Sequence, residues 1–131
     1  MLALPKQGAR DMAGLQILLV EDEFLIRMDL AFTLEDLGHR VEQAQSADAA
    51  MKLLEGGCDF DLLITDIDMP GTLDGIALAF AACDLRPRCL ILILSGGQHP
   101  HPADIPADSV FLSKPVSPSA LKHAISTLQA A

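Results

Sequence analysis

Five short apolar runs alternate with stretches of helical periodicity, and this alternation restricts the chain to one class of fold. The runs are "ILLV" (17–20), the weaker "RVEQA" (40–44), "LLIT" (62–65), "CLILIL" (89–94) and "SVFL" (109–112). The third and fourth are continuously apolar, as is typical of parallel strands that are covered on both faces. Strands that alternate with helices through right-handed crossovers predict an α/β fold, a doubly wound parallel sheet with helices on both faces.

The segment 24–37 shows the first helical pattern. Its apolar stripe, which should face the sheet, consists of Ile26, Leu30, Leu34 and Leu37. We expect this buried stripe to be widened by Leu25, Met28 and Phe32. Gly38 is well suited to end the helix.

Capping residues mark two later helices. Ser46 is suited as the N-cap of a helix that "GG" at 56–57 stops, and Ser117 caps a last helix that opens with Pro118. Another helix is expected from about 74 to 83. The connection 96–108 contains three prolines, so we expect a fourth helix that is short or irregular, with at most one helical turn.

Composition excludes several classes of protein. A chain of 131 residues, half of them hydrophobic, can bury the core of one domain. The net charge of −9, without a basic cluster, argues against a nucleic-acid partner. There is neither a secretory signal nor an apolar stretch of the about 20 residues that a membrane helix needs. We therefore expect a cytoplasmic protein that binds no membrane, with three reduced cysteines, a flexible extension over 1–14 and a folded domain over 15–131.

Polar residues follow every strong strand of the predicted sheet. The first strand ends in Glu21-Asp22-Glu23, the third in Asp66, the fourth in Ser95-Gly96-Gly97 and the fifth in Ser113-Lys114-Pro115. Open α/β sheets bind ligands outside the carboxyl ends of their strands. Any one polar strand end is unremarkable, but together these residues predict a site.

The residue types indicate phosphoryl chemistry. Asp22 and Asp66, with Glu21 nearby, bring negative charges together that repel one another unless a cation joins them. Carboxylate oxygens with open positions suit Mg²⁺, which often shares a phosphate. A carboxylate beside the metal can attack phosphorus and form an aspartyl phosphate, whose oxygens Lys114 and Ser95 can hold.

Four stretches of the sequence resemble the signature motifs of a known family. "ILLVEDE", "LLITDIDMPG", "LILSGG" and "VFLSKP" occur in the order of the signature motifs of response-regulator receivers. Residues 15–130 thus resemble the CheY-like receiver domain of two-component signalling. The resemblance implies a flavodoxin-like five-stranded sheet with strand order 2-1-3-4-5 and Mg²⁺ as the cofactor.

The resemblance also implies a role for each acidic residue. Asp66 would be the phosphoacceptor, and Asp22 would bind Mg²⁺ directly. Glu21 would assist through water, and the backbone carbonyl of Asp68 would be a further metal ligand.

Further positions match the family's phosphate-binding and switching residues. Ser95 takes the place of the hydroxyl residue that phosphorylation draws towards the phosphate, and the next residue, Gly96, leaves room for the phosphoryl group to enter. Lys114 takes the place of the invariant lysine, before Pro115, whose peptide bond is typically cis in the family. Phe111 falls on the switch aromatic, which turns inward after the hydroxyl residue moves. Without a phenolic hydroxyl it would switch by packing alone, and a plain core aromatic is the alternative.

The chain departs from the family pattern at three places. The loop "MPGTLDG" is one residue longer than usual, and the proline-rich segment 96–108 makes the family's usual dimer packing on its output face doubtful. We expect His99 and His101 in that segment to be solvated rather than metal ligands. Asp68 is either a solvated loop acid or a group that tunes water attack on the aspartyl phosphate.

The chain stops directly after its last helix, which favours a stand-alone, single-domain response regulator. Its expected partners are a sensor histidine kinase or histidine phosphotransfer protein and an unidentified downstream protein, and it would catalyse only its own phosphorylation and dephosphorylation. Two alternatives remain. "DIDMPGT" resembles the opening of haloacid dehalogenase-type phosphohydrolases, although the acid pair precedes it here. A receiver fold could also act as a docking module that is never phosphorylated.

Overall fold

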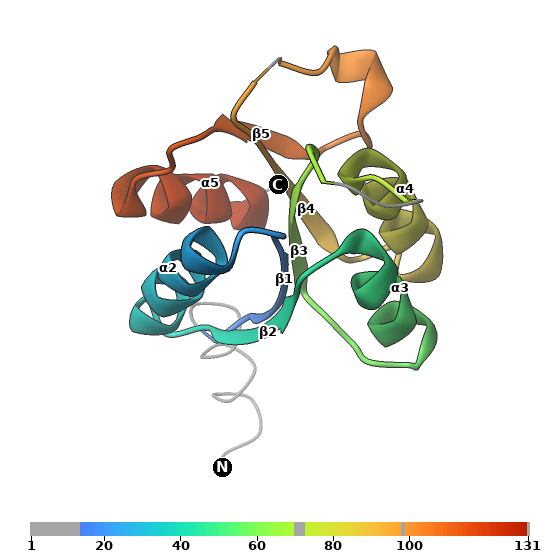
Figure 1. Ribbon diagram of the computed structural model, residues 1–131, viewed down its shortest axis with the longest axis horizontal. Coiled ribbons are helices and arrows are strands. Elements are labelled where there is room, and N and C mark those ends of the chain that lie inside the picture. Colours follow the sequence, from blue (N-terminus) through green and yellow to red (C-terminus); the bar gives the residue numbers. More distant parts are fainter. Residues whose placement is uncertain (1–13, 70–72, 98, 131) are drawn as a thin grey trace.

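A five-stranded parallel sheet forms the centre of the molecule (Figure 1). The computed structural model describes residues 14–69, 73–97 and 99–130, so the expected extension up to residue 13 and residues 70–72 of the lengthened loop lie outside the described residues. The strand order β2-β1-β3-β4-β5, parallel throughout, confirms the predicted flavodoxin-like fold. In chain order the elements are β1 (Gln16–Val20), α2 (Phe24–Asp36), β2 (Arg40–Ala44), α3 (Ala47–Glu55), β3 (Leu62–Asp66), α4 (Gly75–Leu85), β4 (Leu90–Ser95), η1 (Pro102–Asp104), β5 (Val110–Ser113) and α5 (Pro118–Ala130).

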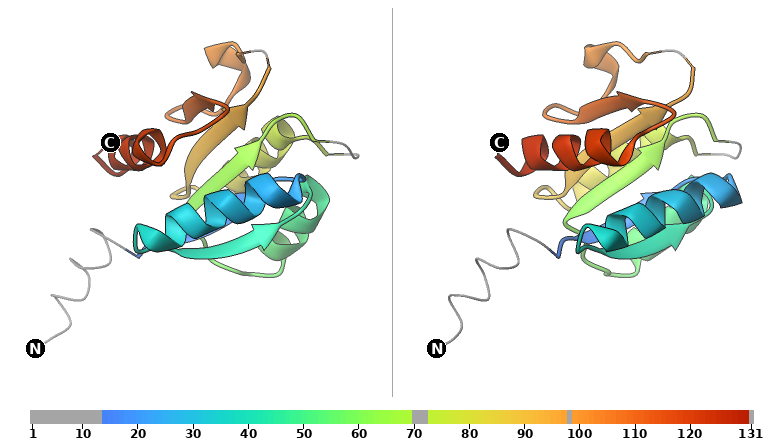
Figure 2. Two further views of the ribbon diagram at one scale, coloured as in Figure 1. Left: turned by 60° about the vertical axis from the view of Figure 1, so that its left-hand side comes forward. Right: turned by 90° about the vertical axis from the view of Figure 1, so that its left-hand side faces the viewer.

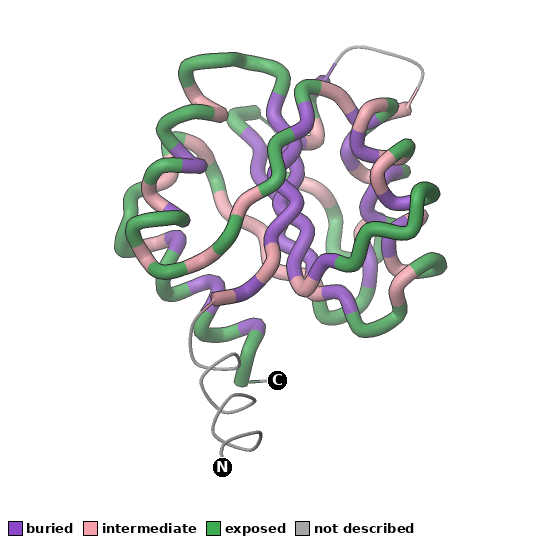
Figure 3. Tube along the Cα trace, turned by 90° about the horizontal axis from the view of Figure 1, so that it is seen from below, coloured by how far each residue is buried: buried purple, intermediate pink, exposed green. Residues whose placement is uncertain are grey.

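Helices cover both faces of this sheet, with α2 and α5 on one face and α3 and α4 on the other (Figures 1 and 2). Side chains of a strand point alternately to the two faces. On β3, Leu62 and Ile64 therefore join the apolar cluster under α2 and α5, whereas Leu63 joins the cluster under α3 and α4. The buried positions concentrate along the central strands (Figure 3), which explains their continuously apolar sequences.

The helix ends follow the predicted caps. Ser46 Oγ accepts a hydrogen bond from the Ala49 N–H at 3.0 Å, at the start of α3. Ser117 Oγ accepts one from the Ala120 N–H at 3.1 Å, at the start of α5. Gly38, just past α2, has a positive φ of 101°, a conformation that glycine adopts without steric cost.

One expectation for α2 is wrong. Leu25, Met28 and Phe32 do not widen the buried stripe, because they are 78%, 44% and 74% exposed. A helix lying on a flat sheet buries only the narrow face turned towards it. On α2 that face carries Leu30, Ala31 and Leu34, all of them buried.

The crossover from β4 to β5 is irregular, as its prolines predicted. In the described part of this segment the only helical element is η1, three residues long. Ile105, just after it, packs against the apolar cluster under α3 and α4, so the segment runs along that side of the sheet. Among the described residues, no helix has the length and apolar character needed to cross a bilayer.

Candidate functional site

The polar strand ends meet at the carboxyl edge of the sheet, as their positions predicted. Glu21 follows β1 directly, Asp66 ends β3, Ser95 ends β4 and Lys114 follows β5. Three of these polar residues are almost fully buried, with exposed fractions of 1% for Glu21, 2% for Asp66 and 1% for Ser95. Buried polar groups are costly unless they are bonded or paired. Lys114 pairs with Glu21 and Asp66, and the Ser95 hydroxyl bonds to Asp68.

Lys114 joins two of the buried carboxylates. Its Nζ lies 2.7 Å from Asp66 Oδ2 and 2.8 Å from Glu21 Oε1. Burial alone would lower the pKa of Lys114, but the hydrogen bonds and charges of the two acids outweigh burial and raise this pKa above its usual value. Lys114 is therefore a stable ammonium at neutral pH. One such ammonium cannot neutralise the whole acidic group around it.

The pKa of Glu21 is raised above its usual value, chiefly by burial. Burial disfavours its charged form and raises its pKa, and the nearby charge of Asp66 raises it further. The hydrogen bonds from Lys114 and from the Glu23 N–H only partly offset these two effects. A further cation at this position would lower the pKa of Glu21 by favouring its charged form.

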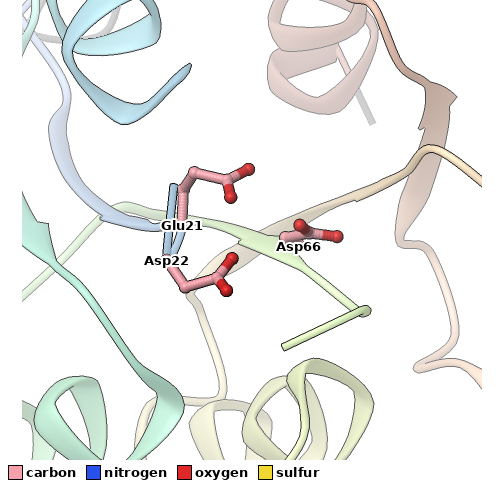
Figure 4. Close-up of side chains that lie close together, drawn as sticks. All are labelled: Glu21, Asp22 and Asp66. Carbon is pink, nitrogen blue, oxygen red and sulfur yellow. The ribbon is translucent and has the colours of Figure 1, made fainter. Parts of the chain in front are cut away.

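Three carboxylates are placed to hold such a cation. One oxygen from each of Glu21, Asp22 and Asp66 lies within 4.8 Å of the others. Figure 4 shows Glu21 and Asp22 reaching this space from the end of β1 and Asp66 from the end of β3. Glu21 and Asp66 are buried but Asp22 is exposed, so the site opens to solvent on one side. An all-oxygen donor set with open positions fits Mg²⁺.

Ser95 and Asp68 make a contact that the sequence did not predict. The Ser95 hydroxyl donates to Asp68 Oδ2 at 3.1 Å. The Asp68 backbone N–H in turn donates to Asp66 Oδ1 at 3.0 Å. Although the Asp68 residue is exposed, its side chain is thus bonded to the site.

A family model of the response regulator receiver domain matches residues 17–126. This chain belongs to that family. Receiver domains are phosphoacceptor modules of two-component systems with an acidic pocket, and histidine kinases phosphorylate them. Membership favours this chemistry over that of a phosphohydrolase.

Individual relatives show how far the similarity extends. The receiver is 32% identical over 116 residues to the sensor kinase CckA of Brucella abortus, a match that covers 85% of this chain and 12% of that kinase. The chain therefore spans only a small part of this curated relative. It also resembles the crystal structure of a response regulator receiver protein from Sinorhizobium medicae, with a TM-score of 0.85 and 32% identity over 90% of this chain and 96% of that one.

A second similar structure bears on the cofactor. It is the response regulator TrrA of Thermotoga maritima in complex with Mg²⁺ and BeF, with a TM-score of 0.75 and 26% identity over 86% of this chain and 97% of that one. Receiver domains bind Mg²⁺ at an acidic cluster, and Glu21, Asp22 and Asp66 form such a cluster here.

Two residues that sequence reasoning missed shape the ends of β1 and β3. A Cβ on Gly75, the first residue of α4, would lie 2.0 Å from the Asp66 carbonyl oxygen, so no larger residue fits there without backbone movement. Arg27 donates from Nη1 to the Glu21 carbonyl at 2.8 Å and thereby fixes the end of β1. Apart from the dipeptide "DG" at 74–75, the local sequence did not point to either residue. Both contacts join residues from different parts of the fold, so neighbouring residues in the sequence do not indicate them.

Phe111, on β5, is in contact with a histidine of the β4–β5 crossover. The ring of half-buried Phe111 packs against the ring of His99, with centroids 4.8 Å apart. His99 is exposed, as expected, yet it is not simply solvated. The Lys114–Pro115 peptide bond is cis, as the resemblance implied.

Proposed function

We propose that Asp66 accepts a phosphoryl group from a phosphohistidine donor. The observation that carries this proposal is the pairing of buried Asp66 with Lys114 at 2.7 Å beside two further carboxylates. In the transfer, the bond between phosphorus and the donor nitrogen breaks, and a bond to an Asp66 carboxylate oxygen forms. The histidine nitrogen keeps the electron pair of the broken bond.

Each neighbouring residue has a task in this transfer. Lys114, now bonded to Asp66 Oδ2, would donate to a phosphoryl oxygen, and the Ser95 hydroxyl would donate to another. Gly96 carries no side chain that would obstruct the entering group. Among the described residues, an added Cβ there would approach Lys114 Cβ, at 3.9 Å, beside the phosphoryl site.

The acidic cluster would hold Mg²⁺. Its ligands would be the Asp22 and Asp66 carboxylates, Glu21 through water and the backbone carbonyl of Asp68. When bound, Mg²⁺ supplies positive charge that offsets the negative charge of the transferring group. Without a cation, the three carboxylates would repel an incoming phosphate group.

The donor would be a sensor histidine kinase or a histidine phosphotransfer protein. The receiver domain would comprise residues 15–131, and the protein would act in the cytoplasm. Movement of Ser95 towards the phosphoryl group would let Phe111 turn inward. The response regulator would then signal by binding a downstream protein, or would act as a phosphate shuttle or sink. It would catalyse only its own phosphorylation and dephosphorylation.

Intact-mass spectrometry tests the acceptor. Incubation with a small-molecule phosphodonor and Mg²⁺ should add one phosphoryl group to the wild type and none to Asp66→Asn. Asp59→Asn is the matched control, because Asp59 precedes β3 at the opposite end of that strand and its side chain is 94% exposed. No adduct on the wild type, under conditions that label another receiver, would instead favour a docking module that is never phosphorylated.

Thermal unfolding tests the metal. Mg²⁺ should raise the melting temperature in a saturable way, because a ligand that binds only the folded state stabilises it by about 2.7 kcal/mol at 100 times its Kd. The increase should be lost in Asp22→Ala and retained in Glu35→Gln, which removes an exposed charge from α2. An equal increase in both variants would contradict the assignment of Asp22.

A further inference from the structure

The Ser95 hydroxyl is already engaged in the structure described here. Ser95 is 1% exposed, and its Oγ accepts a hydrogen bond from the Gly97 N–H at 3.2 Å while donating to Asp68 Oδ2 at 3.1 Å. A serine hydroxyl carries a single proton. Donation to Asp68 and donation to a phosphoryl oxygen therefore exclude one another.

The backbone of Asp68 is also bonded to the site. Its backbone N–H is bonded to Asp66 Oδ1 at 3.0 Å, which ties it to the proposed phosphoacceptor. Its carboxylate lies over Gly97, where an added Cβ would come to 3.9 Å from Oδ2. The side chain thus connects the loop after β3 with the loop after β4, directly at the acidic site.

The carboxylate of Asp68 resembles a phosphoryl group in the properties that matter to a hydrogen-bond donor such as the Ser95 hydroxyl. Both carry negative charge and oxygen acceptors, and hydrogen bonds to charged acceptors are stronger than those between neutral groups. Ser95 is bonded to this acceptor before any phosphoryl group arrives.

We propose that Asp68 is a positioning residue that holds the Ser95 hydroxyl in the resting state, in competition with the phosphoryl group on Asp66. This inference rests on the proposed function, because it concerns the hydroxyl that would bind the phosphoryl group. It assigns Asp68 a role different from tuning the attack of water. The competition weakens the binding of a phosphoryl group and keeps the unphosphorylated protein in its resting conformation.

Beryllofluoride, a phosphoryl mimic that requires no transfer reaction, provides the test. Titration in the presence of Mg²⁺ should show about tenfold tighter binding to Asp68→Ala than to the wild type, the factor expected when a competing charge-assisted hydrogen bond is removed. Alanine keeps the backbone carbonyl and the N–H that bonds Asp66. Asp68→Asn, which keeps an acceptor oxygen without the charge, should lie between the two.

A double-mutant cycle separates this competition from simple charge repulsion. In a Ser95→Ala background, Asp68→Ala should tighten binding no more than Glu23→Ala does, since Glu23 is an exposed carboxylate beside the same acid pair and is not bonded to Ser95. Equal tightening by Asp68→Ala with and without Ser95 would overturn the proposal in favour of repulsion.

The same titration distinguishes a wrong role for Asp68 from a wrong proposed function. If the wild type binds beryllofluoride and Asp68→Ala binds it no better, the role of Asp68 is wrong and the proposed function stands. If the wild type does not bind it at all with Mg²⁺, both are overturned.

Discussion

The imidazole ring of His99 packs against the phenyl ring of Phe111, with the centroids 4.8 Å apart and the ring planes inclined by 59°. His99 Nε2 also lies 3.4 Å from Ser113 Oγ, so the histidine contacts two residues of β5. Tilted aromatic pairs contribute about 0.5–1.5 kcal/mol beyond the area that they bury. The irregular β4–β5 crossover is thereby attached to the proposed switch residue.

This contact predicts that His99→Ala favours the inward position of Phe111. The substitution removes the ring contact that holds half-buried Phe111 in its present position, so an inward conformer should gain population without any phosphodonor. Fluorine NMR of protein labelled with fluorophenylalanine, with Phe111 assigned through Phe111→Leu, measures the two populations. His101→Ala is the control, because His101 bonds the Ala103 N–H in η1 instead. Identical Phe111 signals in both variants would show that His99 does not bias the switch.

Lys114→Ala should strongly destabilise the folded protein in the absence of Mg²⁺. It leaves Glu21 and Asp66 buried without their common cation, and breaking a buried ion pair from one side costs about 3–5 kcal/mol. Urea unfolding at pH 7 with a chelator measures the loss, and Lys122→Ala, at an exposed position of α5, should show almost none.

The pH dependence of this stabilisation follows from the raised pKa of Lys114. A cation whose pKa is higher in the folded state stabilises that state fully below the unfolded value, taken as 10.5, and the stabilisation is lost as the pH rises through the folded value. The difference between wild type and Lys114→Ala should therefore be constant at neutral pH and shrink above pH 10.5. A difference that grows with alkaline pH would contradict the ion pair.

Gly75 and Gly96 should respond differently to the same substitution. Gly75→Ala forces a Cβ to 2.0 Å from the Asp66 carbonyl oxygen, and overpacking of this kind costs about 1–3 kcal/mol or more. Among the described residues, the Cβ of Gly96→Ala meets Lys114 Cβ alone, at 3.9 Å. Its free energy of unfolding should therefore stay within about 0.5 kcal/mol of the wild type, while phosphoryl labelling slows. Urea unfolding and the labelling rate test the pair. Normal labelling of Gly96→Ala would remove Gly96 from the entry path.

The three thiols should react with iodoacetamide in a fixed order. Cys58 is exposed and should react first, whereas Cys89 is buried and burial raises its pKa to about 12. Since the thiolate is the reactive form, Cys89 should stay unmodified at pH 8 in the folded protein. Cys83, half-buried with a pKa that burial raises, should be intermediate. Peptide mass spectrometry measures each site, and all three should react in urea. Early modification of Cys89 would contradict its burial.

The fold and the composition of the site were predictable because they depend on local sequence and on one general rule. Apolar runs such as "LLIT" predicted the strands, and Ser46 and Ser117 predicted two helix starts, since a cap acts within one helical turn. Parallel strands end at one edge of their sheet, so Asp66 and Lys114 could be expected to meet although 48 residues separate them.

The width of the buried face of α2 was not decided by its sequence. Apolar residues surround much of that helix, and an apolar side chain gains from burial only where a neighbour covers it. The sheet lies against Leu30 and Leu34, so Leu25 and Phe32 remain exposed.

The sequence by itself determined the doubly wound sheet and the residue types at its carboxyl edge, because strand and helix periodicity and the strand ends are local properties. Only the tertiary structure decided which atoms meet there. The bond from Ser95 to Asp68, the approach of Gly75 to Asp66 and the packing of His99 on Phe111 each join separate elements. Such contacts depend on ångström-scale placement of one element against another, which packing across the whole core sets.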